Sequence, residues 1–161
     1  MGGKGYKMTY KDYTKKKGAE YSALPIFWAF SEKQLAEALE KRGFTLADAG
    51  RVLYRFGNGG FYLKADADVI KEFFSRDHNA ELHALMENEP GFAAEAIEYE
   101  MLNHEYPINW EGDYDVCSCF GACEYGDSKY GADYLREMGY TEKIVTIYKA
   151  TARKVRSEHE W

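Results

Sequence analysis

Four consecutive residues in the segment YEMLNHEYPINW carry the side chains from which acid–base and metal sites are built. They are Asn103, His104, Glu105 and Tyr106. Helical spacing places Ile97, Met101 and His104 on one face, so we expect His104 on the apolar stripe at the end of a helix. Glu100 stands one turn earlier, where it could accept a hydrogen bond from the imidazole. We interpret the four residues as a structural motif that ties this helix end to the next loop, and we expect no catalytic residue among them.

A second candidate site is formed by the three cysteines, which lie close together in the sequence. They are Cys117, Cys119 and Cys123. With His104 they offer four soft ligands, the number that a structural zinc ion needs. However, the usual two-residue spacing of paired cysteines is absent. On a helix Cys117 and Cys119 would point to nearly opposite sides, whereas on an extended segment they would face the same side. We therefore expect free thiols, no metal and no cofactor, with these four residues as the alternative ligand set.

Charge is distributed unevenly along the chain, whose formal net charge is −6. Residues 77–128 contain 13 Asp and Glu and neither Lys nor Arg, whereas the segments on both sides are net basic. Such an acidic block either folds against the basic flanks or presents an acidic surface to a basic partner. A solvated acidic face without any partner is the third interpretation.

Part of the acidic block falls in segments that we expect to be loops or helix ends, and therefore exposed. The acidic residues there include Glu111, Asp113, Asp115 and Glu124, and the neighbouring aromatic residues are Tyr106 and Trp110. We interpret these six residues as a surface that binds a basic protein, because a negative potential steers a positively charged partner.

The elements that must position these residues are mostly helices. Ser31 and Gln34 form a capping-box pattern ahead of an amphipathic helix that ends at Gly43, and Thr9 is placed to cap a helix over 10–21. Further helices are expected after Asp66, on both sides of the break RDHN, over 92–105, over 127–138 and from the cap Thr141 onwards.

A small sheet should accompany the helices. The apolar run ALPIFWAF (23–30) has the length of a buried strand, and two β-prone runs, 51–56 and 61–64, flank a Gly-rich connection typical of a hairpin. We therefore predict an α+β fold: a single helix-dominated domain over 1–161 with a small antiparallel sheet.

The N-terminal segment and the overall hydropathy bear on location. Residues 1–7 form a Gly- and Lys-rich stretch that we interpret as a flexible basic tail without the apolar region of a secretory signal. The longest apolar run is too short to span a bilayer. Free thiols fit a reducing compartment, so we expect a cytoplasmic protein that does not associate with membranes.

Three segments together resemble a family of small uncharacterised proteins encoded by bacteriophages and other mobile elements. They are MTYKDYTKKKGAEYSALPIFWAFSEKQLAEAL, GNGGFYLKADADVI and YEMLNHEY, and the resemblance covers about residues 8–106. Residues 111–128 look like an insertion relative to that family. The resemblance implies a phage or mobile-element protein working in the cytoplasm of a bacterial host, and it assigns no catalytic role to any residue.

Three classes of function remain open from the sequence. The first is a non-enzymatic accessory protein whose acidic, aromatic surface binds a basic host protein and inhibits a defence nuclease. The second is a protein that binds nucleic acid or a nucleotide through Tyr-rich loops and basic termini. The third is a small metal-dependent or hydrolytic enzyme around His104, against which the lack of a complete catalytic set counts. We expect the first.

Overall fold

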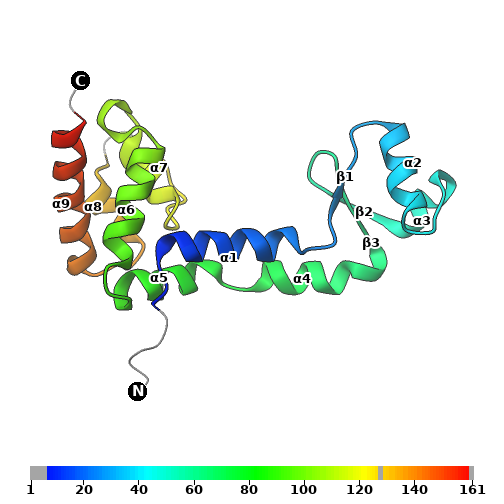
Figure 1. Ribbon diagram of the computed structural model, residues 1–161, viewed down its shortest axis with the longest axis horizontal. Coiled ribbons are helices and arrows are strands. Elements are labelled where there is room, and N and C mark those ends of the chain that lie inside the picture. The colour runs from blue at the N-terminus through cyan, green and yellow to red at the C-terminus, as the bar shows by residue number, and fades with distance from the viewer. Residues whose placement is uncertain (1–6, 127–128, 160–161) are drawn as a thin grey trace, which may run out of the picture. The chain divides into compact units, whose positions relative to one another are not determined.

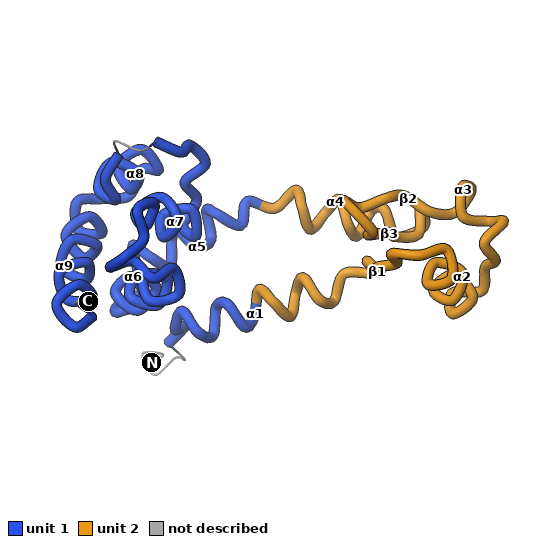
Figure 2. Tube along the Cα trace, turned by 90° about the horizontal axis from the view of Figure 1, so that it is seen from above, with its two compact units in different colours: residues 1–16, 77–161 blue, residues 17–76 orange. Residues whose placement is uncertain are grey.

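The computed structural model describes residues 7–126 and 129–159. The fold is α+β, mostly helical with one three-stranded antiparallel sheet, as predicted (Figure 1). The chain divides into two compact units, residues 1–16 with 77–161 and residues 17–76 (Figure 2). We call them the helical unit and the sheet unit. Whether they fold as the single domain we expected stays a prediction, and the expected basic tail lies, apart from Lys7, outside the described residues.

The sheet unit is built around a hairpin and three helices. Helix α1 (Tyr10–Ser22) begins in the helical unit and continues into this one. The other elements are β1 (Phe27–Trp28), α2 (Glu32–Glu40), α3 (Ala49–Val52), β2 (Leu53–Phe56), β3 (Gly60–Leu63) and α4 (Ala67–Ser75). The strand order is β1-β3-β2, and β2 pairs with β3 as the predicted hairpin.

The buried strand or core segment expected over 23–30 is found only in part. Only Phe27 and Trp28 form a strand, and Phe27 is buried whereas Trp28 is 49% exposed and Phe30 is 74% exposed. Neighbouring side chains of a strand point to opposite faces, which is why Phe27 can be buried while Trp28 is not.

The predicted start of α2 is confirmed. The amide of Gln34 donates to Ser31 Oγ at 3.1 Å, which caps the helix. The side chain of Gln34 accepts from the amide of Phe30 at 2.8 Å, so the reciprocal half of the capping box closes one residue earlier than in the usual motif. Gly43, with φ of 86°, follows the helix end as predicted.

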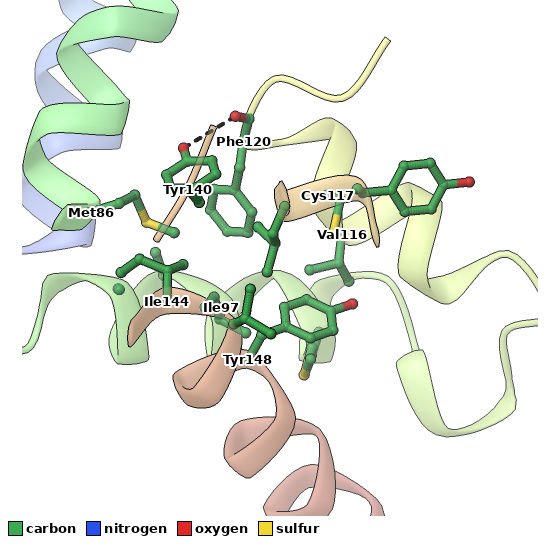
Figure 3. Close-up of a cluster of buried hydrophobic side chains, with 14 of the residues drawn as sticks. Met86, Ile97, Val116, Cys117, Phe120, Tyr140, Ile144 and Tyr148 are labelled. Carbon is green, nitrogen blue, oxygen red and sulfur yellow. Dashed lines mark hydrogen bonds between the residues drawn. The ribbon is translucent and has the colours of Figure 1, made fainter. Parts of the chain in front are cut away.

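The helical unit contains five further α-helices. They are α5 (His78–Asn88), α6 (Phe92–Asn103), α7 (Gly112–Ser118), α8 (Gly131–Glu137) and α9 (Glu142–Glu158). Helices α6 and α9 lie side by side (Figure 1), and buried residues of both belong to one core cluster. Figure 3 shows part of the core of this unit, in which Met86, Ile97, Val116 and Ile144 belong to one buried cluster. Tyr140 donates to the carbonyl of Phe120 at 3.2 Å. Among the described residues, no helix is both long and apolar enough to cross a bilayer.

In this unit one predicted helix start is wrong, and the other is confirmed in position but not in its capping hydrogen bond. Helix α8 begins at Gly131 and not at 127, because the preceding Tyr130 is in an extended conformation as its N-cap; residues 127 and 128 lie outside the described residues. Thr141 does precede α9, but its hydroxyl donates to Glu87 Oε1 at 2.7 Å and does not cap the helix's own amides. The cap of α9 is therefore tied to α5.

Candidate functional site

A buried carboxylate, Glu100, lies at the centre of a polar cluster in the helical unit. It stands on the buried stripe of α6 together with Ala96, Ile97 and Met101, and it is 7% exposed. The hydroxyl of Tyr10 donates to Glu100 Oε2, and Asn103 Nδ2 donates to Oε1 at 3.3 Å. These bonds offset part of the cost of removing a carboxylate from water.

His104 and Cys119 complete this group, which we call the Glu100 cluster: Tyr10, Glu100, Asn103, His104 and Cys119. His104 is the C-cap of α6 and is half-buried, and its Nε2 lies 3.4 Å from Cys119 Sγ and 3.8 Å from Glu100 Oε1. The expected hydrogen bond between His104 and Glu100 is therefore too long, and the thiol is the nearer partner. Cys119 follows the last turn of α7, whose packing against α6 brings the two residues together.

The protonation of this cluster limits its chemistry. Burial raises the pKa of Cys119 to about 12, and the neighbouring Glu100 carboxylate contributes in the same direction. Burial and the hydrogen bond to Glu100 also raise the pKa of Tyr10 well above its usual value. Near neutral pH the thiol of Cys119 is therefore protonated, which makes it a poor nucleophile.

The structure does not bring the three cysteines to one place. Cys117 is buried in the core, where burial raises its pKa to about 12, and its Sγ lies 3.8 Å from the carbonyl of Gly131. Cys123 is exposed, and its Sγ contacts the carbonyl of Gly121. Only Cys119 reaches His104, so the four-residue ligand set considered from the sequence is not assembled.

The acidic and aromatic residues proposed as a partner surface divide into two groups. Glu111, Glu124 and Trp110 are exposed, as expected. Tyr106 is buried, and Asp113 and Asp115 are half-buried, so their expected exposure is wrong.

The physical reason is that the first turn of α7 faces the protein interior. Asp113 Oδ1 accepts from the hydroxyls of Tyr106 at 2.8 Å and Tyr148 at 2.6 Å. Asp115 accepts from Asn109 Nδ2 at 2.8 Å. Hydrogen bonding therefore engages both carboxylates within the fold.

Several members of the acidic block pair with the basic flanks. Glu98 forms an ion pair with Lys154 at 3.0 Å, and Glu124 forms one with Lys129 at 3.6 Å. The two oxygens of Glu87 accept from the hydroxyl and the amide of Thr141, at 2.7 Å each. Part of the acidic block, residues 77–128, thus folds against the basic flanks, which was one of the three interpretations of its charge.

A cavity of about 530 Å³ lies between α7, α8 and α9. Four basic residues line it, together with three tyrosines and two aspartates: Arg136, Lys149, Arg153, Arg156, Tyr106, Tyr130, Tyr148, Asp113 and Asp133. Arg156 donates to the hydroxyl of Tyr106 at 2.9 Å and lies over its ring. Arg153 has no hydrogen-bond or ion-pair partner in the part of the chain that the structure describes. We call this the basic cavity.

Comparison with known proteins gives a family but no activity. A model described as a family of unknown function (DUF7659) matches residues 9–127, and the chain belongs to this family. Neither the curated proteins nor the solved structures gave a match. The matched span contains the whole Glu100 cluster and Trp110, but it ends before α8 and α9, which supply the basic residues of the cavity.

Sequence reasoning missed that Glu100, and not His104, is the buried centre of the site. A signal was present, because Glu100 follows Ala96 and Ile97 at the spacing of the buried face of α6. The role of Tyr10 had no local signal, since it lies 90 residues away in the chain and meets Glu100 only through tertiary packing.

Proposed function

We propose that this protein is a non-enzymatic binding protein that engages a basic protein partner through an exposed apolar and acidic surface. This surface, which we call the Trp110 surface, consists of Leu102, Glu105, Ile108, Trp110 and Glu111. The observation that carries the proposal is Trp110 itself, whose side chain is 101% exposed. An indole left wholly in water gains most when a partner buries it, and Trp is enriched among residues that dominate binding energy.

Two further exposed apolar residues of the helical unit support the same function. Leu102 and Ile108 are 45% and 54% exposed and, with Glu105, line a shallow depression of about 150 Å³. Grouped apolar side chains with a polar rim are typical of sites where another protein docks.

Charge narrows the class of partner. Glu105 and Glu111 are exposed, and within the described residues neither forms an ion pair with Lys or Arg. Lys129 lines a small pocket together with Trp110 and Glu111, but it pairs with Glu124 and Glu137. A basic protein would therefore be steered to this surface, and its association would slow as salt is added.

The biological setting is proposed from the resemblance to phage and mobile-element proteins alone. In that setting the protein is an accessory factor in the bacterial cytoplasm, and the partner is a host protein such as a defence nuclease, which the protein inhibits. The family match is silent on origin.

The test is affinity capture from a bacterial lysate with wild-type protein, Trp110→Ala and Glu111→Lys. We expect a partner of net basic composition that is captured by wild type, lost with Trp110→Ala and weakened with Glu111→Lys. Tyr130→Ala is the matched control, because Tyr130 is a 73% exposed aromatic residue outside the Trp110 surface. Equal capture by wild type and Trp110→Ala would remove the proposal.

Nucleotide or nucleic-acid binding is the second candidate, and the basic cavity favours it. Arg153 and Arg156 project from one face of α9 beside Tyr130 and Tyr148, which combines phosphate-binding cations with aromatic rings. The test is titration of ATP and of a short single-stranded DNA at physiological salt, with Arg153→Glu as the variant and Lys143→Glu as the control outside the cavity. Tight binding that only Arg153→Glu abolishes would place this function ahead of the first.

A further inference from the structure

We propose that Glu100, His104 and Cys119 bind one divalent transition-metal ion, with Zn²⁺ preferred. The three side chains offer one oxygen, one nitrogen and one sulfur atom, all within 4.8 Å of one another. The site is separate from the Trp110 surface and from the basic cavity, so it does not depend on the proposed function.

The distances fit the spacing of ligands around such an ion. Zn–S and Zn–N bonds of about 2.3 and 2.05 Å separate neighbouring ligand atoms of a tetrahedral site by roughly 3.3–3.6 Å. Here His104 Nε2 lies 3.4 Å from Cys119 Sγ and 3.8 Å from Glu100 Oε1. Small side-chain rotations would therefore suffice to close the three ligands on a common centre.

The ligand types select the metal. A thiol that can be deprotonated, an imidazole and a carboxylate suit a borderline ion such as Zn²⁺, whereas Mg²⁺ and Ca²⁺ prefer oxygen ligands alone. Binding would release the proton of Cys119, since the thiolate is the form that ligates.

The charge balance of the site favours a cation. Glu100 is 7% exposed, and its described hydrogen bonds come from the neutral donors Tyr10 and Asn103. No Lys or Arg side chain within the described residues pairs with it. A buried carboxylate without a fixed positive charge nearby is costly, and a bound divalent ion would compensate for it.

The surroundings of Glu100 resemble the outer shell of a metal site. Tyr10 and Asn103 hold the carboxylate in place by hydrogen bonds, as groups behind a metal ligand do. Tyr10 is itself fixed, because its ring packs edge-on against Phe92 and contacts Phe120. The carboxylate is thus positioned before any ion arrives.

Three protein ligands leave one position of a tetrahedral ion open. The side chain of His104 is 30% exposed and Cys119 is half-buried, so water or a small ligand could reach that position. Cys117 and Cys123 take no part, which is why the cysteine spacing in the sequence did not reveal this ligand set. A water molecule, a small ligand or a side chain of a partner protein would complete the tetrahedral coordination.

The decisive experiment is titration of the full chain, stripped with chelator under reducing conditions, with Zn²⁺ and with Co²⁺. We expect one equivalent of metal per chain, a rise in melting temperature with Zn²⁺, and a thiolate-to-cobalt charge-transfer absorption with Co²⁺. Cys119→Ser and His104→Gln should abolish the absorption, and Tyr10→Phe should weaken affinity by about 10–100-fold. Cys123→Ser is the matched control and should behave as wild type.

Two results would overturn the site. One is wild-type protein that retains no metal after gel filtration and shows no cobalt absorption. The other is an absorption that survives in Cys119→Ser or disappears in Cys123→Ser, because the thiolate ligand would then be a different cysteine. Far-UV circular dichroism of the metal-free variants checks their fold. If Cys119→Ser does not fold, Glu100→Gln decides, since it keeps the shape of the ligand and should still lose the metal.

Discussion

The helical unit and the sheet unit differ in what they can bury. The helical unit has a continuous core that fully encloses side chains such as Ile97, Val116 and Leu135. The buried core cluster of the sheet unit consists of Leu24, Ile70 and Phe73. Among the described residues, the two buried polar side chains, Glu100 and Thr151, both belong to the helical unit. A buried polar side chain therefore needs a core large enough to enclose its hydrogen-bond partners as well as the side chain itself.

The aromatic residues show the same difference. In the sheet unit Trp28, Phe30, Tyr54 and Phe74 are between 47% and 74% exposed. In the helical unit Tyr10, Tyr106, Tyr140 and Tyr148 are buried, and the hydroxyl of each makes a hydrogen bond. The helical unit also exposes aromatic residues, among them Tyr99, Trp110 and Tyr130. The difference therefore lies in the tyrosines that its core encloses, which combine apolar packing with a hydrogen bond.

The largest effect should come from emptying the larger core. Ile97 is fully buried, so Ile97→Ala should lower the free energy of unfolding by about 2–5 kcal/mol through lost burial and a cavity. Val69, on α4, is 52% exposed, so Val69→Ala should change the free energy of unfolding by less than about 0.5 kcal/mol. Urea titration of both variants is the measurement, and a cost for Ile97→Ala as small as that of the control would contradict the described core.

Hydrogen exchange can show whether the two units are also separate in stability. The sheet unit has the smaller core. We therefore expect the amides of α4 and the sheet to exchange through openings of lower free energy than the amides of α6 and α9. Native-state exchange in low denaturant, resolved by residue, is the measurement. Equal protection throughout would mean that the chain opens as one cooperative unit, as a single domain does.

Two glycines, one tightly packed and one with open space around it, should give stability changes of opposite sign when replaced by alanine. A Cβ at Gly131 would lie 2.1 Å from the ring of buried Tyr148, so Gly131→Ala should cost about 1–3 kcal/mol. Gly18, in α1, has nothing within 4 Å, so Gly18→Ala should add about 0.5–1 kcal/mol through helix propensity. Melting curves of the two variants test this, and a loss at Gly18 would show that space there is needed.

The link between α5 and α9 should make stability depend on acid. Burial of Glu87 opposes its ionisation, but the hydrogen bonds from Thr141 outweigh this and lower the pKa of the carboxyl. The stabilisation is therefore present above the unfolded pKa of about 4.3 and is lost as the pH falls through the lower folded pKa. Glu87→Gln should flatten the fall in melting temperature below about pH 4. Glu89→Gln keeps the Glu87 contacts and should leave the pH dependence of the melting temperature unchanged. The same pH dependence for wild type and Glu87→Gln would contradict the proposed link.

The smallest effect concerns the backbone that ends α6. Glu105 has a φ of 52°, the left-handed region that favours glycine. Glu105→Gly should relieve this strain and raise the free energy of unfolding by up to about 1 kcal/mol. Glu111→Gly, at a φ of −102°, should give no such gain. Denaturant titration of both variants is the measurement, and a loss at Glu105 would mean that its side chain makes a contact worth more than the strain.

Much of the secondary structure follows from local signals. Ser31, Gln34 and Gly43 predict the bounds of α2, and the glycine-rich connection predicts the β2–β3 hairpin, because caps and turns depend on residues close in sequence. The strand expected over 23–30 fails for the opposite reason. Which of its side chains are covered depends on elements that are distant in the sequence.

Helix caps, hydrophobic periodicity and turn residues were enough to predict an α+β, helix-dominated chain, and the charge distribution revealed an acidic block without Lys or Arg of its own. Tertiary structure alone decided which acids are exposed: it buried Glu100 beneath Tyr10, turned Asp113 towards Tyr148 and left Glu111 beside a fully exposed Trp110. It also brought Cys119, and no other cysteine, to His104. The physical reason is that helix caps and periodicity act over one or two turns, whereas a buried carboxylate needs hydrogen-bond donors from segments that only the folded core brings together.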